Sequence, residues 1–309
     1  MRVLVTGGAG FIGTNLVRRL LSEGHYVICV DNLITGKKEN IEDLLDKENF
    51  VFFEQDINEP TDYGDVDWIF HLASIGSVYH YLNHPVETLK TGGIGTINML
   101  EYAKEKNARI LFSSTSEVYG DPEVHPQNED YRGNVSSIGP RSCYDESKRY
   151  AEALMMAYHR KYNVDTRIAR IFNTYGPYMD PDDRRVLPNF ISQGLKGEPM
   201  TIYGDGSQTR SYCYVDDTVD GLMRLMETDY HLPVNIGNPE EYTILETAEI
   251  VCEVMGIEKN FVFMPLPEDD PMRRRPDITR AKEILGWEPG VKFRDGLKET
   301  IKWFQKRLQ

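Results

Sequence analysis

The sequence predicts an α/β protein: a doubly wound parallel sheet followed by a smaller C-terminal α/β part that binds a substrate. Three observations predict this fold class. Short apolar segments alternate with amphipathic helical segments in the first half of the chain, a glycine-rich turn directly follows the first apolar segment, and the alternation weakens after about residue 172. Alternating strands and helices form parallel sheets whose two faces are covered by helices.

The expected elements follow one another as strand and helix. Six short segments rich in apolar and β-branched residues are expected to be strands: Arg2–Thr6, Tyr26–Val30, Phe50–Phe53, Trp68–Leu72, Arg109–Ser113 and Thr166–Phe172. Three longer segments are expected to be helices: Phe11–Glu23, Val86–Lys106 and Tyr144–Tyr162. Within Val86–Lys106, apolar residues recur at steps of three and four, which indicates a helix with a broad apolar face.

The composition indicates a globular protein that acts on small molecules. Of the 309 residues, 40% are hydrophobic and 27% are charged, which argues against disorder. Lys and Arg together number 35 and Asp and Glu 49, so the formal net charge is −14. We expect no nucleic-acid partner and no membrane partner for so acidic a chain, although local basic clusters can still bind phosphate groups.

The cysteines favour a reducing compartment. Cys29, Cys143, Cys213 and Cys252 are scattered without a Cys-x-x-Cys pair, which fits neither a disulfide framework nor a zinc site. No apolar run approaches the ~18 residues of a membrane span, and the chain begins with a strand pattern rather than a signal peptide. We therefore expect a cytoplasmic protein.

A dinucleotide site is expected between the first strand and the first helix. Gly7, Gly10 and Gly13 form the pattern G-x-x-G-x-x-G there, which suits a tight turn, close approach to a pyrophosphate, and close helix–strand packing. Asp31 follows 18 residues after Gly13, where a carboxylate accepts ribose hydroxyls and repels a 2′-phosphate. These features predict a Rossmann fold that binds NAD rather than NADP. The alternative is a simple glycine turn beside a solvated aspartate.

Further residues are assigned to the cofactor site. Asp56 is expected to bind the adenine amino group, although an aspartate at a strand end is also a common turn residue. The remaining candidates adjoin the same turns: Phe11, Ile12, Asn32, Ile57, Leu72, Ala73 and Ser74. We expect an NAD-binding domain at 1–172, with later segments around 205–238 returning to it, and a part at 173–309 that mainly binds the substrate.

Candidate catalytic residues lie on the third expected helix and after the fifth expected strand. Tyr144 and Lys148 are four residues apart and so share one helix face. An ammonium beside a phenol, aided by a positive nicotinamide, lowers the tyrosine pKa and allows Tyr144 to act as a base. Thr115, Ser116 and Glu117 follow the strand, at the edge where open α/β sheets bind ligands, and Thr115 is expected to hydrogen-bond the oxygen that Tyr144 deprotonates. A surface Tyr–Lys pair is the alternative interpretation.

The glycine turn, the strand-end hydroxyl and Tyr-x-x-x-Lys, in this order, resemble the extended short-chain dehydrogenase/reductase family, over essentially the whole chain. Within it, the finer motifs are similar to the UDP-glucuronate decarboxylases, also called UDP-xylose synthases. The matching stretches are 71–74, 113–126, 139–149, 169–177, 203–210, 234–241, 274–278 and 285–289. Thr115-Ser116-Glu117 resembles the decarboxylase form, whereas dTDP-glucose 4,6-dehydratases carry Thr-Asp-Glu and UDP-sugar 4-epimerases usually lack the glutamate.

The resemblance implies a lyase that converts UDP-glucuronate to UDP-xylose through a 4-keto intermediate, with the hydride taken by bound NAD and returned. Glu117 would position a water or act on the leaving carboxylate; capping of its own loop is the alternative. Arg274 would face the sugar and stabilise a carboxylate or enolate. The resemblance also implies a UDP site. The alternative for its arginines is that they form surface ion pairs, and the alternative for Tyr203 is that it is a core aromatic. The residues of the UDP site are Asn173, Arg185, Tyr203, Gln208, Arg210 and Arg274.

Two segments depart from the family pattern. Residues 75–80 lack the usual prolines, and Gly92 and Gly93 replace a more usual polar pair. Because both segments border the sugar and nicotinamide in the family, a UDP-sugar 4-epimerase and a dTDP-glucose 4,6-dehydratase stay open as alternatives, as does a non-catalytic NAD-binding protein. The family also implies a homodimer in which Val86–Lys106 and Tyr144–Tyr162 of two chains form a four-helix bundle.

Overall fold

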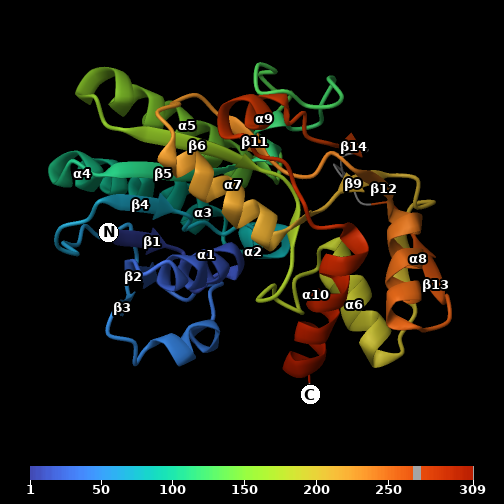
Figure 1. Cartoon of the computed structure of the whole chain (residues 1–309). Coiled ribbons are helices and arrows are strands. Elements are labelled where there is room, and N and C mark those ends of the chain that lie inside the picture. The colour runs from blue at the N-terminus through green and yellow to red at the C-terminus, as the bar shows by residue number, and fades with distance from the viewer. Residues whose placement is uncertain (267–272, 309) are drawn as a thin grey trace.

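The computed structural model describes residues 1–266 and 273–308, and its largest element is a seven-stranded sheet (Figure 1). The strand order is β11-β6-β5-β4-β1-β2-β3, and all neighbouring strands in the sheet are parallel. The strands are β1 (Arg2–Thr6), β2 (Tyr26–Asp31), β3 (Phe50–Glu54), β4 (Trp68–His71), β5 (Arg109–Thr115), β6 (Thr166–Ile171) and β11 (Val234–Ile236). The predicted fold class is confirmed.

Helices cover both faces of this sheet. They are α1 (Phe11–Ser22) and α7 (Val215–Glu227) on one face, and α4 (Thr96–Lys106) and α5 (Ser142–Tyr162) on the other. Side chains alternate along β1, so that Val3 and Val5 belong to the core under α1 and α7, whereas Leu4 belongs to the core under α4 and α5. The alternation of side chains along each strand therefore determines which residues enter each of the two cores.

The predicted helix over Val86–Lys106 is confirmed, and it contains a π-helical turn that the sequence did not predict. The segment divides into α3 (Pro85–Lys90), a π-helical turn η3 (Thr91–Gly95) and α4, and a short helix α2 (Val78–Asn83) precedes them. Glycine is a poor helix former, and a Cβ on Gly92 would lie 2.6 Å from the Cβ of Ser147 on α5. The wide turn therefore lies where α3 and α4 approach α5 closely.

The second part of the chain lies at the right of Figure 1, around α6, α8 and α10. Its helices are α6 (Val186–Lys196), α8 (Ile244–Met255) and α10 (Phe293–Leu308), whereas α9 (Thr279–Leu285) packs against β11 and α7 at the edge of the large sheet. Its short strands are β7 (Thr174–Tyr175), β8 (Met200–Tyr203), β9 (Thr209–Ser211), β10 (Cys213–Tyr214), β12 (Glu241–Thr243), β13 (Phe261–Met264) and β14 (Arg273–Arg274). They form the small sheets β10-β7, β12-β9-β14 and β13-β8. In the first part of the chain, short 3₁₀ turns follow β2 and β5: η1 (Lys38–Asn40), η2 (Glu42–Leu44) and η4 (Ser116–Tyr119).

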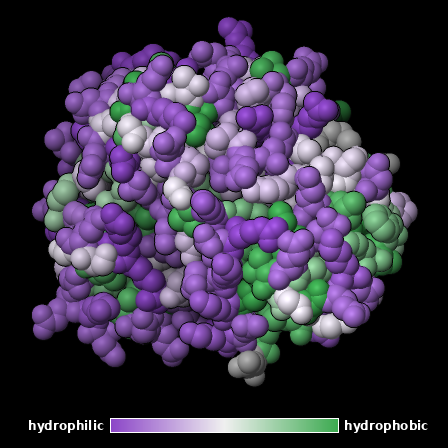
Figure 2. Space-filling view, turned by 45° about the vertical axis from the view of Figure 1, so that its right-hand side comes forward, coloured by the Kyte–Doolittle hydropathy of each residue, from purple (hydrophilic) through white to green (hydrophobic). Residues whose placement is uncertain are grey.

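The surface is mostly hydrophilic, with hydrophobic patches on the side that carries the second part of the chain (Figure 2). In the described part of the chain, each helix is too short or too polar to span a bilayer. Cys29, Cys143, Cys213 and Cys252 are all buried as free thiols.

Candidate active site

A pocket lies at the carboxyl ends of β1, β2, β4 and β5, between the large sheet and the second part of the chain. It brings together most of the residues that the sequence assigned to a site. These are Gly7, Gly10, Phe11, Ile12, Gly13, Asp31, Asn32, Asp56, Ile57, Leu72, Ala73, Ser74, Thr115, Ser116, Glu117, Tyr144, Lys148, Asn173 and Arg185. In the described part of the chain, Tyr203, Gln208, Arg210 and Arg274 are not among its lining residues.

The glycine turn leaves open space because side chains are missing from it. Gly7 has a φ of 70°, a left-handed conformation that favours glycine, and a Cβ there would lie 2.8 Å from the backbone nitrogen of Ala73. A Cβ on Gly13 would lie 2.0 Å from the carbonyl oxygen of Gly7. Helix α1 begins directly after Gly10 and has no acidic residue in its first turn. The turn thus presents backbone N–H groups and a positive helix end to an anion.

Asp31 is fixed at the end of β2 by the backbone. Its Oδ2 accepts a hydrogen bond from the Ala9 N–H at 3.1 Å, and its Oδ1 accepts one from the Leu33 N–H at 2.9 Å. Burial raises the pKa of Asp31, and these hydrogen bonds oppose that shift. Because each carboxylate oxygen has two lone pairs, both can still accept from a ribose hydroxyl.

Asp56 follows β3 and already has partners in the protein. Its Oδ2 accepts a hydrogen bond from Asn32 Nδ2 at 3.3 Å, and its Oδ1 accepts one from the Asn58 N–H at 2.9 Å. An adenine amino group would therefore share Asp56 with these two donors.

Tyr144 lies in the first turn of α5 and is buried, and the Thr115 side chain lies close enough to its hydroxyl to affect its ionisation. Burial raises the pKa of Tyr144 to about 12, and the neighbouring Thr115 side chain offsets only part of that rise. The Tyr144 ring stacks on the ring of Tyr81, with 5.0 Å between centroids and 5° between planes. Two aromatic rings in this arrangement fix the direction of the Tyr144 phenol.

Lys148 lies one helical turn beyond Tyr144 and is also buried. Its Nζ donates a hydrogen bond to the carbonyl oxygen of Ser113 at 2.7 Å, and burial lowers the pKa of Lys148 to about 7. Without the nicotinamide, desolvation of both groups dominates, and the prediction that Lys148 and a positive nicotinamide together lower the pKa of Tyr144 stays a prediction. A positive charge bound beside them would shift the pKa of Tyr144 downward.

Glu117 lies between two arginines. Its Oε2 is 2.7 Å from Arg141 Nη2, and its Oε1 is 2.6 Å from Arg274 Nη1. Burial alone would raise the pKa of Glu117, but the two guanidinium groups outweigh burial and lower it to about 2. Glu117 is therefore ionised, and the cluster of Glu117, Arg141 and Arg274 carries a net charge of +1.

Arg274 lies behind Glu117 and outside the pocket wall. Its side chain is 3% exposed, and it also donates hydrogen bonds to Ser116 Oγ at 3.3 Å and to the carbonyl oxygen of Gly120 at 2.9 Å. These contacts make Arg274 a support for the Thr115–Glu117 segment.

The candidates for a UDP site fall into two groups: Asn173 and Arg185 line the pocket, and the others lie on or next to β8, β9 and β14. Arg185 is paired with Asp183 at 2.5 Å in the pocket wall. Tyr203 is exposed at the end of β8, and Gln208 is buried with its Nε2 donating to the carbonyl oxygen of Tyr203 at 3.1 Å. Arg210 is buried on β9 and donates to the carbonyl oxygen of Thr209 at 2.8 Å.

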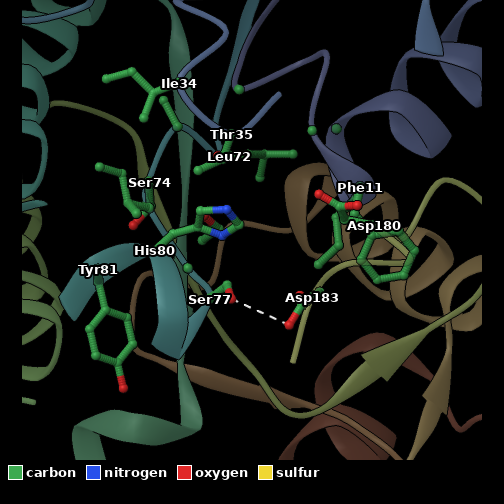
Figure 3. Close-up of a pocket in the computed structure, with 18 of the residues that line it drawn as sticks. Phe11, Ile34, Thr35, Leu72, Ser74, Ser77, His80, Tyr81, Asp180 and Asp183 are labelled. Atoms are coloured by element: carbon green, nitrogen blue, oxygen red, sulfur yellow. Dashed lines mark hydrogen bonds between the residues drawn. The ribbon is translucent and has the colours of Figure 1, made fainter. Parts of the chain in front are cut away.

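The sequence analysis missed several pocket residues. Figure 3 shows Ser77, before α2, joined to Asp183 by a hydrogen bond of 3.3 Å, with His80 and Tyr81 on the same helix. This bond connects the end of the large sheet to the segment before α6. Only Arg141 had a usable signal: it stands three residues before Tyr144, at the spacing that places two residues on one helix face.

Comparison with known proteins gives the family. The sequence model of the family described as GDP-mannose 4,6 dehydratase matches residues 4–300. The chain belongs to this family. It is 53% identical over 308 residues to UDP-glucuronic acid decarboxylase 1 of Danio rerio, which covers 100% of this chain and 73% of the relative. It is 54% identical over 309 residues to UDP-glucuronic acid decarboxylase 6 of Arabidopsis thaliana, covering 100% of this chain and 90% of the relative.

Solved structures of the family share the fold over their whole length. A UDP-glucose 4-epimerase from Thermotoga maritima, solved with UDP-glucose, superposes with a TM-score of 0.92 at 35% identity and covers 100% of both chains. A UDP-glucuronic acid 4-epimerase from Bacillus cereus, in complex with UDP-glucuronic acid and NAD, superposes with a TM-score of 0.88 at 30% identity, covering 99% of this chain and 100% of that one. The resemblance stated from the sequence motifs is confirmed.

Proposed function

We propose that this protein is an NAD-dependent decarboxylase that converts UDP-glucuronate to UDP-xylose and carbon dioxide. One observation of the site carries the proposal: an ionised Glu117, held by Arg141 and Arg274, lies beside the Tyr144–Thr115 pair in the same pocket as the glycine turn. Whole-chain identity to UDP-glucuronic acid decarboxylases supports the same substrate.

The pocket residues fit NAD. The space that a Cβ would fill at Gly7 and Gly13 suits a pyrophosphate above the positive end of α1, and the fixed carboxylate of Asp31 suits two ribose hydroxyls. We assign the contacts along the cofactor to the turns that adjoin them. These are Phe11, Ile12, Asn32, Asp56, Ile57, Leu72, Ala73 and Ser74. When bound, NAD supplies reversible hydride removal at carbon 4 of the sugar, which gives a 4-keto sugar.

Tyr144 is the proposed base for the 4-hydroxyl of the sugar. The Thr115 side chain lies beside the Tyr144 hydroxyl, and the Tyr144 ring stacks on Tyr81. The ordinary pKa of a tyrosine is about 10, so Tyr144 needs a neighbouring positive charge in order to accept a proton at neutral pH. Lys148 lies 5.8 Å from the centre of the Tyr144 ring and is placed to supply one when protonated.

In this proposal Glu117 and Ser116 act on the carbon-5 side of the sugar, and Arg274 supports them from behind Glu117. A carboxylate on carbon 5 is β to the 4-ketone, so the bond between carbon 5 and the carboxyl carbon breaks with its electron pair passing to an enolate. Carbon dioxide leaves, and carbon 5 then takes up a proton. The net charge of +1 on the Glu117 cluster favours the enolate electrostatically. The two arginines keep Glu117 ionised, so it can orient a water as the proton source.

We propose that residues 1–172, with segments around 205–238, form the NAD-binding domain and that 173–309 mainly bind the nucleotide. Asn173 and Arg185 face the pocket. Tyr203, Gln208 and Arg210 belong to β8, β9 and the turn between them, and we assign them to the base and phosphates. The cytoplasmic location stays a prediction.

The experiment is a product assay with UDP-glucuronate. We expect UDP-xylose and one equivalent of carbon dioxide without net consumption of NAD. The alternative 4-epimerase activity, which the epimerases of similar fold favour, would give UDP-galacturonate and no carbon dioxide. Addition of dTDP-glucose tests the dehydratase alternative in the same assay. Absence of UDP-xylose from enzyme that contains NAD would reject the proposal.

We also propose that two copies of the chain form a dimer through a four-helix bundle. The helices α3, α4 and α5 pack together and leave large hydrophobic side chains exposed on them. Val86 is 56% exposed, Leu89 47%, Ile94 46% and Tyr150 50%. Light scattering on the purified protein is expected to give twice the chain mass, and Leu89→Glu is expected to give the monomer. A wild-type monomer at micromolar concentration would reject this interface.

A further inference from the structure

We infer that Arg141 recognises the carboxylate on carbon 5 of the sugar and thereby selects a hexuronate over a neutral hexose. This inference rests on the proposed function, because it names the residue that distinguishes the substrate of that same site. None of the sequence motifs assigned Arg141 a role.

The position of Arg141 sets it apart from Arg274. Both guanidinium groups bind Glu117, but the Arg141 side chain is 21% exposed and lines the pocket, whereas Arg274 is 3% exposed and lies behind the cluster. Arg141 is also the N-cap of α5, three residues before Tyr144. A group bound to Arg141 therefore lies near the base that acts on carbon 4.

The Arg141 guanidinium has donors to spare. It carries five N–H groups, and the bond to Glu117 uses one of them. Within residues 1–266 and 273–308, that bond is its one hydrogen bond. A guanidinium binds a carboxylate through two parallel N–H donors, and such a pair is about twice as strong as neutral hydrogen bonds. The remaining donors of Arg141 are sufficient for this geometry.

The surrounding charge also favours an anion. Glu117 cancels one of its two arginine partners, which leaves one positive charge on the cluster. Asp145 lies nearby, but burial and the charge of Glu117 raise the pKa of Asp145 to about 7, so that Asp145 is partly neutral at neutral pH. In the described part of the chain, the Tyr81 hydroxyl and Asp145 Oδ1 are buried without hydrogen-bond partners. A site that binds a polar ligand is one place where such groups occur.

Glu117 makes this recognition compatible with loss of the carboxylate. After carbon dioxide leaves, Arg141 still has its Glu117 partner, so no buried cation is left unpaired. Binding of the substrate carboxylate to Arg141 stabilises the ground state and gives selectivity, whereas the enolate is stabilised by the whole cluster. We therefore expect Arg141 to affect the KM for UDP-glucuronate more than the kcat.

The test compares two ligands on NAD-loaded enzyme by calorimetry: UDP-glucuronate and UDP-glucose, which carries a neutral hydroxymethyl group on carbon 5. Arg141→Gln is expected to weaken UDP-glucuronate binding on the order of 10- to 100-fold and to change UDP-glucose binding less than about twofold. Arg141→Lys, which keeps the charge, is expected to retain most of the preference for UDP-glucuronate. Arg160→Gln, at an exposed position of the same helix, is the matched control and is expected to match the wild type.

Each outcome decides the assignment. An equal loss for both ligands would give Arg141 a purely structural role, and unchanged binding of both would remove it from the site; either result overturns the inference. The KM of Arg141→Gln for UDP-glucuronate is expected to rise by the same factor as the dissociation constant. If the wild type bound UDP-glucuronate selectively through Arg141 but made no UDP-xylose, the proposed function would fail while this inference stood.

Discussion

The two ends of the pocket are lined by different groups: backbone at the cofactor end and side chains at the sugar end. At the cofactor end, the walls are backbone: the turn around Gly7 and Gly13 is shaped by absent side chains, and Asp31 is held by backbone N–H groups. At the sugar end, the walls are charged and aromatic side chains, with Glu117 paired to Arg141. The first end depends on shape, and the second depends on charges that the protein has desolvated.

This difference explains the unequal pKa shifts. Burial raises the pKa of Asp31, but the backbone N–H groups that donate to its carboxylate oppose that shift. Tyr144 and Lys148 are also shifted toward their neutral forms by burial, to pKa values of about 12 and about 7, and among the described residues no backbone N–H group is among the causes that oppose their shifts. A charged ligand bound at the sugar end would therefore change the ionisation of Tyr144 and Lys148. At the cofactor end, the hydrogen bonds that hold Asp31 are already formed without a ligand.

The largest expected effect comes from removing the Tyr144 hydroxyl. Tyr144→Phe keeps the ring stacked on Tyr81 but loses the proton acceptor, so kcat for UDP-glucuronate should fall about 10²- to 10⁴-fold. The NAD content of the purified variant, measured by cofactor extraction, should equal that of the wild type because the glycine turn is untouched. Full turnover in this variant would remove Tyr144 from the role of base.

Substitution of Gly13 is expected to disrupt NAD binding without affecting the sugar end of the pocket. A Cβ at this position would lie 2.0 Å from the Gly7 carbonyl oxygen, so α1 must move away from the turn. Overpacking of this kind costs about 1–3 kcal/mol of unfolding free energy. Gly13→Ala should lose NAD on purification and unfold at lower urea concentration, while UDP binding stays measurable by calorimetry.

Gly197→Ala is the matched control for Gly13. Unlike Gly13, Gly197 has a positive φ, of 70°, but no atom lies within 4 Å of the position that its Cβ would take. Its substitution should cost about 1 kcal/mol through backbone strain and leave NAD content unchanged. Equal NAD content in both variants would contradict the account of the turn.

The next prediction concerns Lys148, whose replacement is expected to abolish turnover but to raise the free energy of unfolding at low pH. Lys148 has a pKa of about 7 in the folded protein against an ordinary 10.5, so between these values the unfolded chain binds more protons and wild-type stability rises with pH. Below about pH 7 the full cost of burying a charged lysine is present. Lys148→Met removes that cost, and it also removes the hydrogen bond to Ser113.

We expect Lys148→Met to be more stable than the wild type by about 1–2 kcal/mol near pH 6 and no more stable near pH 10, although its turnover is lost. Urea unfolding at the two pH values measures this difference. A wild type whose stability does not rise over this range would show that Lys148 stays charged in the folded protein.

The same contrast explains what the sequence could predict. The glycine spacing and Asp31 are local signals, because a strand, a turn and a helix fix their geometry within a short stretch. Tyr144 and Lys148 were found for the same reason. The partners of Glu117 were not, since Arg141 and Arg274 come from distant segments and only the folded chain brings them together.

The π-helical turn within Val86–Lys106 was missed for a related reason. Its apolar period is helical, but the close approach of Gly92 to Ser147 on another helix cannot be read from that period. Val86 and Leu89 fit the helical pattern, yet both are exposed in the single copy of the chain. Apolar periodicity indicates which face of a helix packs, but it does not identify the surface that packs against that face.

The smallest expected effect concerns Asp56, whose carboxylate already accepts hydrogen bonds from Asn32 and Asn58. If the cofactor end is built mainly from backbone, Asp56→Ala should weaken NAD binding only about two- to fivefold, the value of one modest hydrogen bond. Asp31→Ala, which removes a carboxylate that the backbone holds in place, should weaken it more. Titration of the NAD-free variants with NAD gives both dissociation constants. A larger loss for Asp56→Ala than for Asp31→Ala would show that side-chain contacts, and not the backbone cradle, dominate at this end of the pocket.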